Sequence, residues 1–519
     1  MNLPLENTLF QSLPIPWLLD PHGLRSFPGP FLARFSDLWL GRVAQQGHRS
    51  EIVHALHEKY GTFVRIAPNH LSISDPAALQ IIYAHGNGSL KANFYDAFVS
   101  IARGLFNTRS RAEHSRKRKI IAHIFSQKSV LEFEPYVKTY VQSFMEQWDR
   151  LCVAGAKGLQ GNDGEGGWRG RDGRVWLDCL PWYNYLAFDI IGDLAFGSPF
   201  GMIAAAKDSA PVAKSQEQAI SMYGQGDSKC DTVSIPAIKI LNERGEYSAA
   251  TGVLPLWLRP VVKRYIPWYS RGSEAVEHLA GLAIAAVAKR LSSPAYRVDV
   301  LSKLQDGKDD NGNPMGREEL TAEALTQLIA GSDTTSNSSC AITYYLASNP
   351  NVQKKLQKEL DDALANEDDP VSSYEVVKNL PYLEAVINEA LRLHSTSGIG
   401  LPRIVPQGGL TIQGHFFEEG TTLSVPSYTI HRDREVWGDD ALVFRPERWF
   451  ERDNQAIQKT FNPFSYGPRA CVGRNLATLE LLVIISSIFR RYEVVLEHPD
   501  RPLETREGFL RKPLSAGLG

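Results

Sequence analysis

The chain has 519 residues, of which 43% are apolar and 22% are charged, so it is long enough to bury a large core. Its 56 Lys and Arg residues nearly balance its 58 Asp and Glu residues, which excludes a protein that binds nucleic acid through bulk positive charge. Its five cysteines are odd in number and widely spaced, which excludes a disulfide framework and favours a reducing compartment.

No linker, repeat or heptad run divides the sequence, so we expect one large, mainly α-helical domain with a small β portion over residues 27–519. Residues 1–26 form an N-terminal segment whose apolar stretch, residues 13–19, is interrupted by two prolines. A membrane-spanning helix needs about 20 apolar residues, and a signal peptide needs a basic start and a longer apolar core. We expect either that the start of the chain was shortened or rebuilt, or that membrane contact is peripheral.

The first hundred residues alternate between helix and strand patterns. Residues 49–60 have helical spacing, whereas residues 62–66 and 71–74 alternate with period two and predict a hairpin. A further helix is expected to begin after Pro76. Residues 90–107 mix aromatic and polar side chains, and we expect a long irregular segment of the kind that often carries function.

A strongly basic helix is predicted over residues 113–125, with four consecutive basic residues at 116–119. Most of these charges are explained by a solvated helix face. His114 and Arg118, however, are four residues apart and share one face, from which they could reach the carboxylates of a ligand. The remaining basic residues could dock an acidic electron donor.

The middle of the chain gives weaker signals. Residues 154–173 contain eight glycines without a following GK[ST] sequence, so we expect a flexible surface insertion rather than a phosphate loop. An apolar helix is predicted over residues 182–196 and an amphipathic one over residues 276–291. Residues 198–267 cannot be divided into elements from their pattern.

A long helix is predicted over residues 321–346, and it contains the sequence Ala-Gly-Ser-Asp-Thr-Thr at positions 330–335. Glycine and clustered hydroxyls weaken a helix interior, which a mild packing kink would explain. An acid beside an alcohol at such a point also forms a proton-delivery pair, so Asp333 and Thr334 are the candidate catalytic residues.

An acid and an arginine, Glu389 and Arg392, lie three residues apart in an apolar helix. Most such pairs are exposed and contribute little. The apolar neighbours favour burial, and Arg448 from a later segment is expected to join them. We therefore predict a buried structural network that braces the cysteine loop described next.

The last cysteine, Cys471, lies between two glycines, with Arg469 two residues before it and Phe464 seven before it. A long helical pattern follows, and a thiolate near a helix N-terminus is stabilised by the dipole and by backbone N–H donors. Gly473 would let the backbone pass close to a flat cofactor. A lone cysteine is most often a buried structural residue, but this combination predicts a thiolate ligand to haem iron.

Several cationic side chains could bind the two propionates of a haem. We expect Arg118, Arg403 and Arg469 to do so, with His114 next. His431 is a weaker candidate, because a histidine is as often a structural hydrogen-bonding group.

Four motifs occur in one order along residues 27–514: His-xxx-Arg at His114, Ala-Gly-x-Asp-Thr-Thr at Ala330, Glu-x-x-Arg at Glu389 and the loop at Cys471. Together they resemble the motifs of the cytochrome P-450 superfamily. Within it, the chain is most similar to the fungal benzoate 4-monooxygenase (benzoate para-hydroxylase) family. The stretches that carry this second resemblance are residues 85–88, 94–100, 104–109, 320–329, 394–397, 425–431 and 504–513.

The resemblance implies the cytochrome P-450 fold, a haem b whose iron is bound by Cys471, and a monooxygenase that converts benzoate to 4-hydroxybenzoate. It further implies O2 as a substrate and electrons from NADPH through NADPH–cytochrome P-450 reductase. In this family Asp333 and Thr334 would deliver protons during oxygen activation. The family is expected on the cytosolic face of the endoplasmic reticulum membrane, although the sequence shows no clear anchor.

Para hydroxylation requires the substrate carboxylate to be held away from the iron by charged or hydrogen-bonding groups. The polar candidates are Tyr95, Ser100, Arg103, Thr396 and Ser397. Candidates for the apolar walls are Ile399 and Phe509.

Three alternatives remain open at this point. The same chemistry could act on another small aromatic acid. A haem-thiolate isomerase or dehydratase would use no external oxygen, and a non-enzymatic haem-binding sensor or carrier would catalyse nothing.

Overall fold

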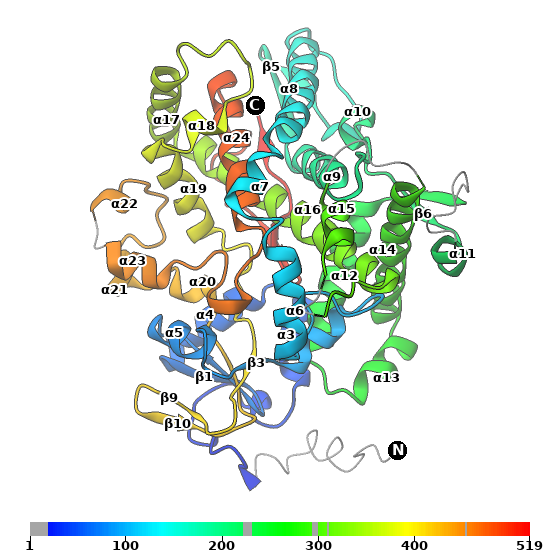
Figure 1. Cartoon of the computed structure of the whole chain (residues 1–519). Coiled ribbons are helices and arrows are strands. Elements are labelled where there is room, and N and C mark those ends of the chain that lie inside the picture. Colours follow the sequence, from blue (N-terminus) through cyan, green and yellow to red (C-terminus); the bar gives the residue numbers. More distant parts are fainter. Residues whose placement is uncertain (1–18, 222–230, 293–298, 309–310, 452–453) are drawn as a thin grey trace.

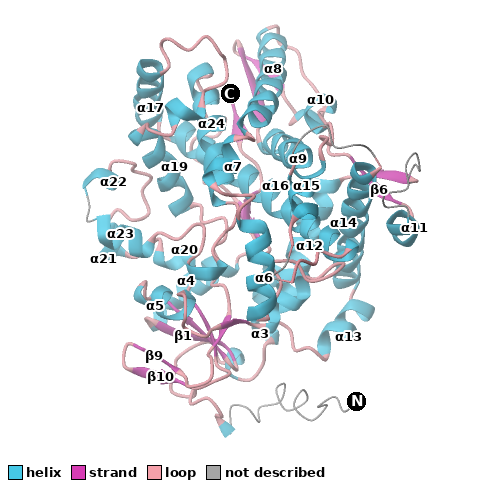
Figure 2. Ribbon diagram, viewed as in Figure 1, coloured by secondary structure: helices cyan, strands magenta, loops and turns pink. Residues whose placement is uncertain are grey.

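Helices make up most of the molecule, and the strands form five sheets of two to five strands among the described residues (Figures 1 and 2). The computed structural model describes residues 19–221, 231–292, 299–308, 311–451 and 454–519. This arrangement confirms the prediction of a mainly α-helical fold with a small β portion.

The helices follow one another along the whole chain. Up to residue 221 they are η1 Leu32–Arg34, α3 Leu38–Gln46, α4 Arg49–Tyr60, α5 Ala77–Tyr83, η2 Asn93–Phe98, α6 Arg111–Ala122, α7 Gln127–Leu131, α8 Glu134–Ala156, η3 Asp163–Glu165, α9 Leu180–Phe196, α10 Met202–Ala205 and α11 Gln216–Ser221. The later ones are α12 Ala237–Gly252, α13 Leu258–Tyr265, α14 Pro267–Leu291, α15 Val300–Asp306, α16 Arg317–Ser348, α17 Pro350–Ala363, α18 Tyr374–Val377, α19 Pro381–Leu393, α20 Ser427–Ile430, α21 Arg434–Trp437, α22 Arg448–Glu451, α23 Asn454–Thr460, η4 Gly467–Arg469 and α24 Arg474–Arg491.

The largest sheet has five strands in the order β1-β2-β11-β8-β3. Their bounds are β1 Phe63–Ala67, β2 His70–Ile73, β3 Leu90–Lys91, β8 Arg403–Ile404 and β11 Thr422–Ser424. Strands β1 and β2 form the predicted antiparallel hairpin. Strand β8 pairs with β3 so that Arg403 lies opposite Lys91, which brings two basic residues from distant parts of the chain together.

The remaining strands form small sheets. They are β4 Arg169–Arg171, β5 Arg174–Asp178, β6 Ala210–Ala213, β7 Thr232–Ile235, β9 Leu410–Ile412, β10 His415–Phe417, β12 Thr505–Glu507, β13 Arg511–Pro513 and β14 Gly517–Leu518. Strand β14 pairs with β5, β6 with β7, β9 with β10, and β12 with β13, all antiparallel.

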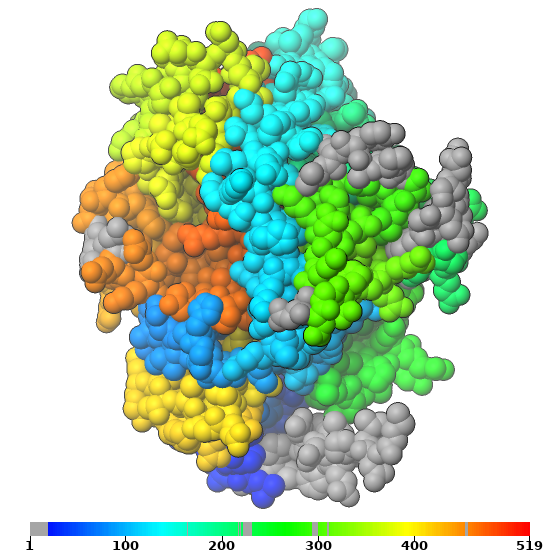
Figure 3. Space-filling view, in the orientation of Figure 1, coloured from blue at the N-terminus to red at the C-terminus, as the bar shows by residue number. Residues whose placement is uncertain are grey.

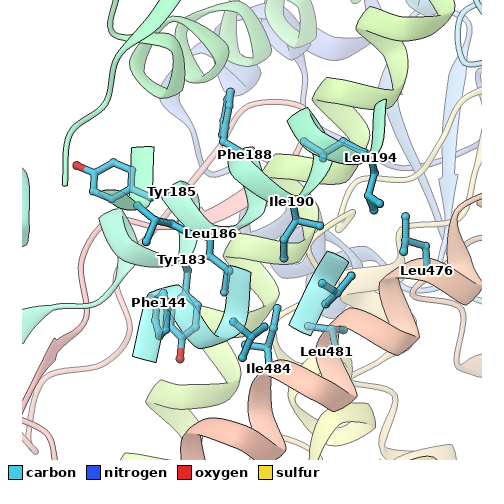
Figure 4. Packing of buried hydrophobic residues seen from close by; sticks show 14 of the residues in the cluster. Phe144, Tyr183, Tyr185, Leu186, Phe188, Ile190, Leu194, Leu476, Leu481 and Ile484 are labelled. Atoms are coloured by element: carbon cyan, nitrogen blue, oxygen red, sulfur yellow. The ribbon is translucent and has the colours of Figure 1, made fainter. Parts of the chain in front are cut away.

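The main core lies between α8, α9, α16 and α24 (Figure 4). In it, Phe144 of α8 stacks on Tyr183 of α9 with the ring centroids 5.5 Å apart. Helix α9 crosses α16 at Gly331, where a Cβ would come within 2.8 Å of the Ile191 side chain. This glycine permits close helix packing, so its cost to helix propensity is offset by contact with α9.

Four helices begin before the predicted bounds: α9 by two residues, α14 by nine, and the two described next. The helix expected at residues 321–346 begins at Arg317 and ends at Ser348. The basic helix α6 begins two residues early, because the Ser110 side chain accepts a hydrogen bond from the Glu113 backbone and caps it. Residues 198–267, which the pattern could not divide, contain short strands and helices, among them α12.

The glycine-rich segment, residues 154–173, differs from our expectation in having regular structure. Strand β4 pairs with β5, and Trp168 is buried. A Cβ on Gly170 would overlap the Gly155 carbonyl, so glycine lets the two backbones touch. Strands β4 and β5 pack back onto α8.

No helix within the described part of the chain is long and apolar enough to cross a membrane.

Buried His57 links α4 to the sheet, and it generates a prediction about acid stability. Its Nδ1 lies 2.9 Å from the Gly61 carbonyl oxygen and its Nε2 lies 2.8 Å from Ser72 Oγ. Burial lowers the pKa of His57 from 6.5 to about 4, so the unfolded chain binds this proton first as the pH falls. The stability that depends on neutral His57 is fully present above pH 6.5 and is lost as the pH falls toward 4. Between pH 7 and pH 5 this loss lowers the free energy of unfolding by about 2 kcal/mol.

We therefore expect His57→Gln to lower the free energy of unfolding at pH 7 and to lose less stability than the parent protein on acidification to pH 5. Urea unfolding at both pH values measures the difference, with the exposed His85→Gln as the control. An equal loss in the parent and in His57→Gln would contradict the assignment.

Candidate functional site

One cavity connects most of the predicted site residues. Parts of the chain far apart in sequence line it: the segment after η2, helices α12, α16 and α24, the residues after α19, and the loop at Cys471. Side chains that line it and bear on the argument are Phe98, Ser100, Asn107, Arg244, Thr326, Thr334, Thr396, Ser397, Phe464, Arg469, Cys471 and Phe509.

The cysteine loop is held in a tight turn at one wall of this cavity. The Cys471 backbone N–H donates to the Phe464 carbonyl over 2.8 Å, and Gly467 has a φ of +72°. A Cβ on Gly467 would overlap the Tyr83 carbonyl, so the turn needs glycine there. Helix α24 begins just after the loop, with Gly473 at its N-cap.

The Cys471 thiol opens into the cavity. Burial raises its pKa above the ordinary value, and the Gly473 backbone N–H and the charges of Arg118 and Arg474 partly oppose this rise. These groups stabilise the thiolate, which is the form that binds a metal ion. The sulfur and its donors therefore fit the thiolate side of a haem site.

Positive charge surrounds the loop. Arg118 Nη1 donates to the Ala470 carbonyl over 2.7 Å, and Arg469 Nη1 donates to the Thr108 carbonyl over 2.7 Å. Arg403 Nη1 donates to the Tyr95 hydroxyl over 2.8 Å, while its Nη2 is buried without a partner. We call His114, Arg118, Arg403, Arg469 and Lys91 the cationic cradle.

Charge repulsion within the cradle is visible in the pKa values. The pKa of His114 falls to about 3 through burial and through the charges of Arg469, Lys91, Arg118 and Arg403, in that order. Burial and then Arg403 lower the pKa of Arg469 to about 10. None of the ion pairs between described residues joins a carboxylate to His114, Arg118, Arg403 or Arg469. Two carboxylates of a bound haem would supply the missing negative charge, so these residues fit its propionates.

Lys91 is a member of the cradle that the sequence did not predict. It is buried, its Nζ donates to the Phe106 carbonyl, and it lies 4.5 Å from the Tyr95 ring centroid. Burial and then Arg403 lower its pKa well below the ordinary value. No motif marks it, because it reaches the site only through the pairing of β3 with β8.

The candidate catalytic pair lies on α16 beside the cavity. Thr334 lines the cavity, and its hydroxyl donates to the Ala330 carbonyl over 2.6 Å. Asp333 lies outside the cavity lining and accepts from Asn337 Nδ2 over 3.1 Å. Burial raises the pKa of Asp333, and Lys512 and the Asn337 bond partly oppose it.

A second buried acid near this pair was not predicted. Glu480 of α24 accepts a hydrogen bond from the Thr335 hydroxyl over 2.8 Å. Burial raises its pKa to about 7. The apolar run around Glu480 in the sequence was a signal that the acid is buried.

The predicted substrate residues divide into two groups. Ser100, Thr396, Ser397 and Phe509 line the cavity. Tyr95 and Ile399 lie outside its lining, in an aromatic cluster with Phe94 and Phe98, and the Tyr95 hydroxyl is engaged by Arg403.

Arg103 requires a correction as a carboxylate anchor. Its side chain is 47% exposed, it forms an ion pair with Asp96 over 2.8 Å, and it faces the surface. Within the same irregular segment, Ser100 lines the cavity whereas Arg103 lies on the side that faces solvent. Arg244 of α12 lines the cavity instead, and it comes from the region that the sequence pattern could not divide.

The predicted structural residues form a fully buried ion network. Glu389 accepts from Arg392 Nε over 2.9 Å and from Arg448 Nε over 2.8 Å, and all three side chains are 0% exposed. Trp449 Nε1 and the Arg445 backbone N–H also donate to this carboxylate. Arg448 Nη1 also pairs with Asp440 over 3.0 Å, so two carboxylates compensate the two guanidiniums, as burial requires.

The network extends to the cysteine loop through His431. Arg392 Nη1 donates to the His431 carbonyl over 2.7 Å, and His431 Nε2 accepts from the Asn462 backbone N–H over 3.1 Å. Its Nδ1 lies 2.8 Å from Ser395 Oγ. Both ring nitrogens are thus engaged by protein groups, so His431 is a structural residue and not a propionate ligand.

Helix α6 lies at the surface beside the cysteine loop (Figure 3). Lys117 is nevertheless buried and forms ion pairs with Glu319 and Glu323 of α16, and Arg116 also pairs with Glu319. These two residues join α6 to α16, so they do not belong to a docking face. Arg111 and Lys119 are the exposed basic residues of the helix.

Comparison with known proteins agrees with this geometry. The family profile described as cytochrome P450 matches residues 26–518. The chain is 50% identical over 514 residues to the Aspergillus niger protein named benzoate 4-monooxygenase bphA, covering 97% of this chain and 94% of the relative. It is also 31% identical over 504 residues to the Fusarium vanettenii protein named pisatin demethylase, covering 94% of this chain and 89% of the relative.

The two glycines of the loop give a matched pair of substitutions. Gly467→Ala should destabilise the haem-free protein by more than about 1 kcal/mol, because of its positive φ and the clash with the Tyr83 carbonyl. Gly473→Ala meets nothing within 4 Å and should leave that stability unchanged, while lowering haem retention after gel filtration if the cofactor passes this residue. Equal destabilisation by both substitutions would refute this account.

Removing the charge at the centre of the buried network should be costly. Glu389→Gln leaves two buried arginines undercompensated, so we expect the free energy of unfolding to fall by about 3–5 kcal/mol. Asp362→Asn breaks the exposed ion pair with Lys358 and should change the urea midpoint little. A Glu389→Gln protein as stable as its parent would show that the network does not brace the fold.

Proposed function

Since this chain belongs to the cytochrome P450 family, we propose that it hydroxylates benzoate at the ring carbon opposite the carboxylate, giving 4-hydroxybenzoate. The reaction would use O2 and two electrons that originate in NADPH. The observation that carries the proposal is the match, over nearly the whole chain, to the Aspergillus niger protein named benzoate 4-monooxygenase.

The walls of the cavity are suited to an aromatic ring. Phe509 lies 5.0 Å from Phe98 and 5.1 Å from Phe106, measured between ring centroids, and all three line the cavity. Both contacts are edge-to-face, the geometry that aromatic pairs favour. A small planar ring can make the same contacts with these side chains.

Haem bound at Cys471 would supply O2 activation and the transfer of one oxygen atom to the substrate. Cys471 would hold the iron, and the cationic cradle would hold the propionates. The backbone turn of the loop presents the sulfur to the cavity, and the Gly473 backbone N–H, Arg118 and Arg474 would stabilise the thiolate once it forms.

We assign proton delivery to Asp333 and Thr334. The Thr334 hydroxyl is open to the cavity, and its neighbour Asp333 has a pKa raised by burial. A raised pKa lets a carboxyl group hold a proton closer to neutral pH, which suits a proton relay. Because Asn337 occupies Asp333 Oδ1, the proton would sit on Oδ2.

We further propose electron delivery by NADPH–cytochrome P-450 reductase at the face around α6, and location at the endoplasmic reticulum membrane. Exposed Arg111 and Lys119 support the first, since basic residues attract an acidic partner. A group of exposed apolar side chains on and beside α13 supports membrane contact. These are Leu256, Trp257, Val261, Tyr265 and Ile266.

The function is tested with the purified protein, its reductase, NADPH and benzoate. We expect 4-hydroxybenzoate whose new oxygen comes from labelled O2, and we expect Cys471→Ala to reduce product to the level of the protein-free control. The reduced, carbon-monoxide-treated parent should show the red-shifted absorption of thiolate ligation. A product that contains no oxygen from labelled O2 would favour an isomerase or dehydratase. The absence of any product would favour a non-enzymatic haem carrier.

A further inference from the structure

Arg244 is a buried arginine that lines the cavity and takes part in neither haem binding nor proton delivery as proposed above. It lies on α12, is 7% exposed, and lines the cavity. Its Nη2 donates to the Phe98 carbonyl over 3.0 Å, and its guanidinium carbon lies 5.4 Å from the Phe98 ring centroid. The Phe98 carbonyl also accepts from Asn107 Nδ2 over 3.0 Å, which fixes the position of the guanidinium.

No acid neutralises Arg244. None of the ion pairs between described residues includes it, and its Nε is buried without a partner. A guanidinium has five N–H donors, and the Phe98 carbonyl accepts only one of them. Burial lowers its pKa to about 10, so the group remains charged at neutral pH. Burying such a charge without a partner is costly, which indicates that an anion belongs beside it.

The cavity offers few other places for an anion. Among the described residues that line it, Arg244 and Arg469 are the only basic ones, and none is an Asp or Glu. Arg469 donates to the carbonyls of Thr108 and Arg109 and belongs to the cationic cradle. Arg244 is therefore the basic lining residue that lies outside the cradle.

The cavity also extends along α16 beyond the catalytic pair. The segment that begins at Phe98 packs on α16 at Gly104, where a Cβ would come within 2.6 Å of Thr326 Oγ1. Thr326 and Thr334 both line the cavity, and at 1.5 Å per residue they are about 12 Å apart along the helix axis. The cavity therefore follows α16 for more than two helical turns from Thr334.

We propose that Arg244 binds the substrate carboxylate, with the Ser100 hydroxyl as a second donor, and that this contact selects aromatic acids over neutral arenes. Ser100 lines the same cavity, and its Oγ is buried without a partner. This inference rests on the proposed function, in which the substrate is a small aromatic acid. It replaces Arg103, which faces the surface, as the charged anchor.

The test compares ligand binding, not turnover, in four proteins: the parent, Arg244→Gln, Arg244→Lys and Lys239→Gln. Lys239 is an exposed basic residue of the same helix and serves as the matched control. Each protein in its haem-bound form is titrated with benzoate and with toluene, which has the ring without the charge. The shift of the haem absorption band gives the dissociation constants, and the carbon-monoxide spectrum confirms that each variant is folded.

We expect Arg244→Gln to weaken benzoate binding by about 30-fold or more, because a buried charge pair loses one partner. Toluene binding should stay within about threefold of the parent. Arg244→Lys keeps the charge but not the planar fork, so it should bind benzoate with intermediate affinity. Lys239→Gln should match the parent with both ligands.

The possible results distinguish an error in the Arg244 assignment from an error in the proposed function. If the parent binds benzoate and both Arg244 variants bind it equally well, the anchor assignment is wrong and the proposed function stands. If the parent itself fails to bind benzoate, the proposed function is wrong. Should Arg244→Gln fail to fold, Arg244→Lys decides: unchanged benzoate affinity overturns the assignment, and a loss confined to benzoate supports it.

Discussion

Buried positive charge without matching negative charge is the constraint on which this site depends. Arginines and a lysine of the cationic cradle lie around the cysteine loop, and burial together with mutual repulsion lowers the pKa of Arg469 and keeps the neighbouring His114 neutral. A fold does not retain such an arrangement for its own stability, since each unpaired buried charge opposes folding. A ligand that carries two carboxylates would neutralise the cradle, and haem held at Cys471, as proposed above, would meet that requirement.

The Glu389 network shows the opposite arrangement a short distance away. There each buried cation has a carboxylate or carbonyl partner, and the network reaches the cysteine loop through His431 and Asn462. The protein can thus satisfy buried arginines where their only task is structural. This contrast makes the unsatisfied cations at the cavity meaningful, and it means that the shape of the loop is fixed by groups that need no cofactor.

The sequence predicted those parts of the site that local motifs define. Cys471, Asp333 and Thr334 lie in short motifs whose chemistry can be read from neighbouring residues, and helical spacing placed Glu389 beside Arg392. Lys91 and Arg244 could not be found this way. The pairing of β3 with β8 brings Lys91 to the site, and the packing of α12 on η2 brings Arg244 to the cavity. Arg103 was misassigned for a related reason: in an irregular segment, closeness in sequence to Ser100 does not tell which side chain faces inward.

The two sets of cations make separate demands on ligands. If haem carboxylates neutralise the cradle, Arg244 still lacks a counter-ion, because no ion pair between described residues includes it and its Nε is buried without a partner. Binding of the cofactor therefore leaves the cavity with one unpaired charge beside aromatic walls. A neutral arene would leave that charge unpaired, whereas an aromatic acid neutralises it and occupies the apolar walls at once. Selectivity for acids then follows from the free energy of a buried guanidinium that only a charged ligand can neutralise.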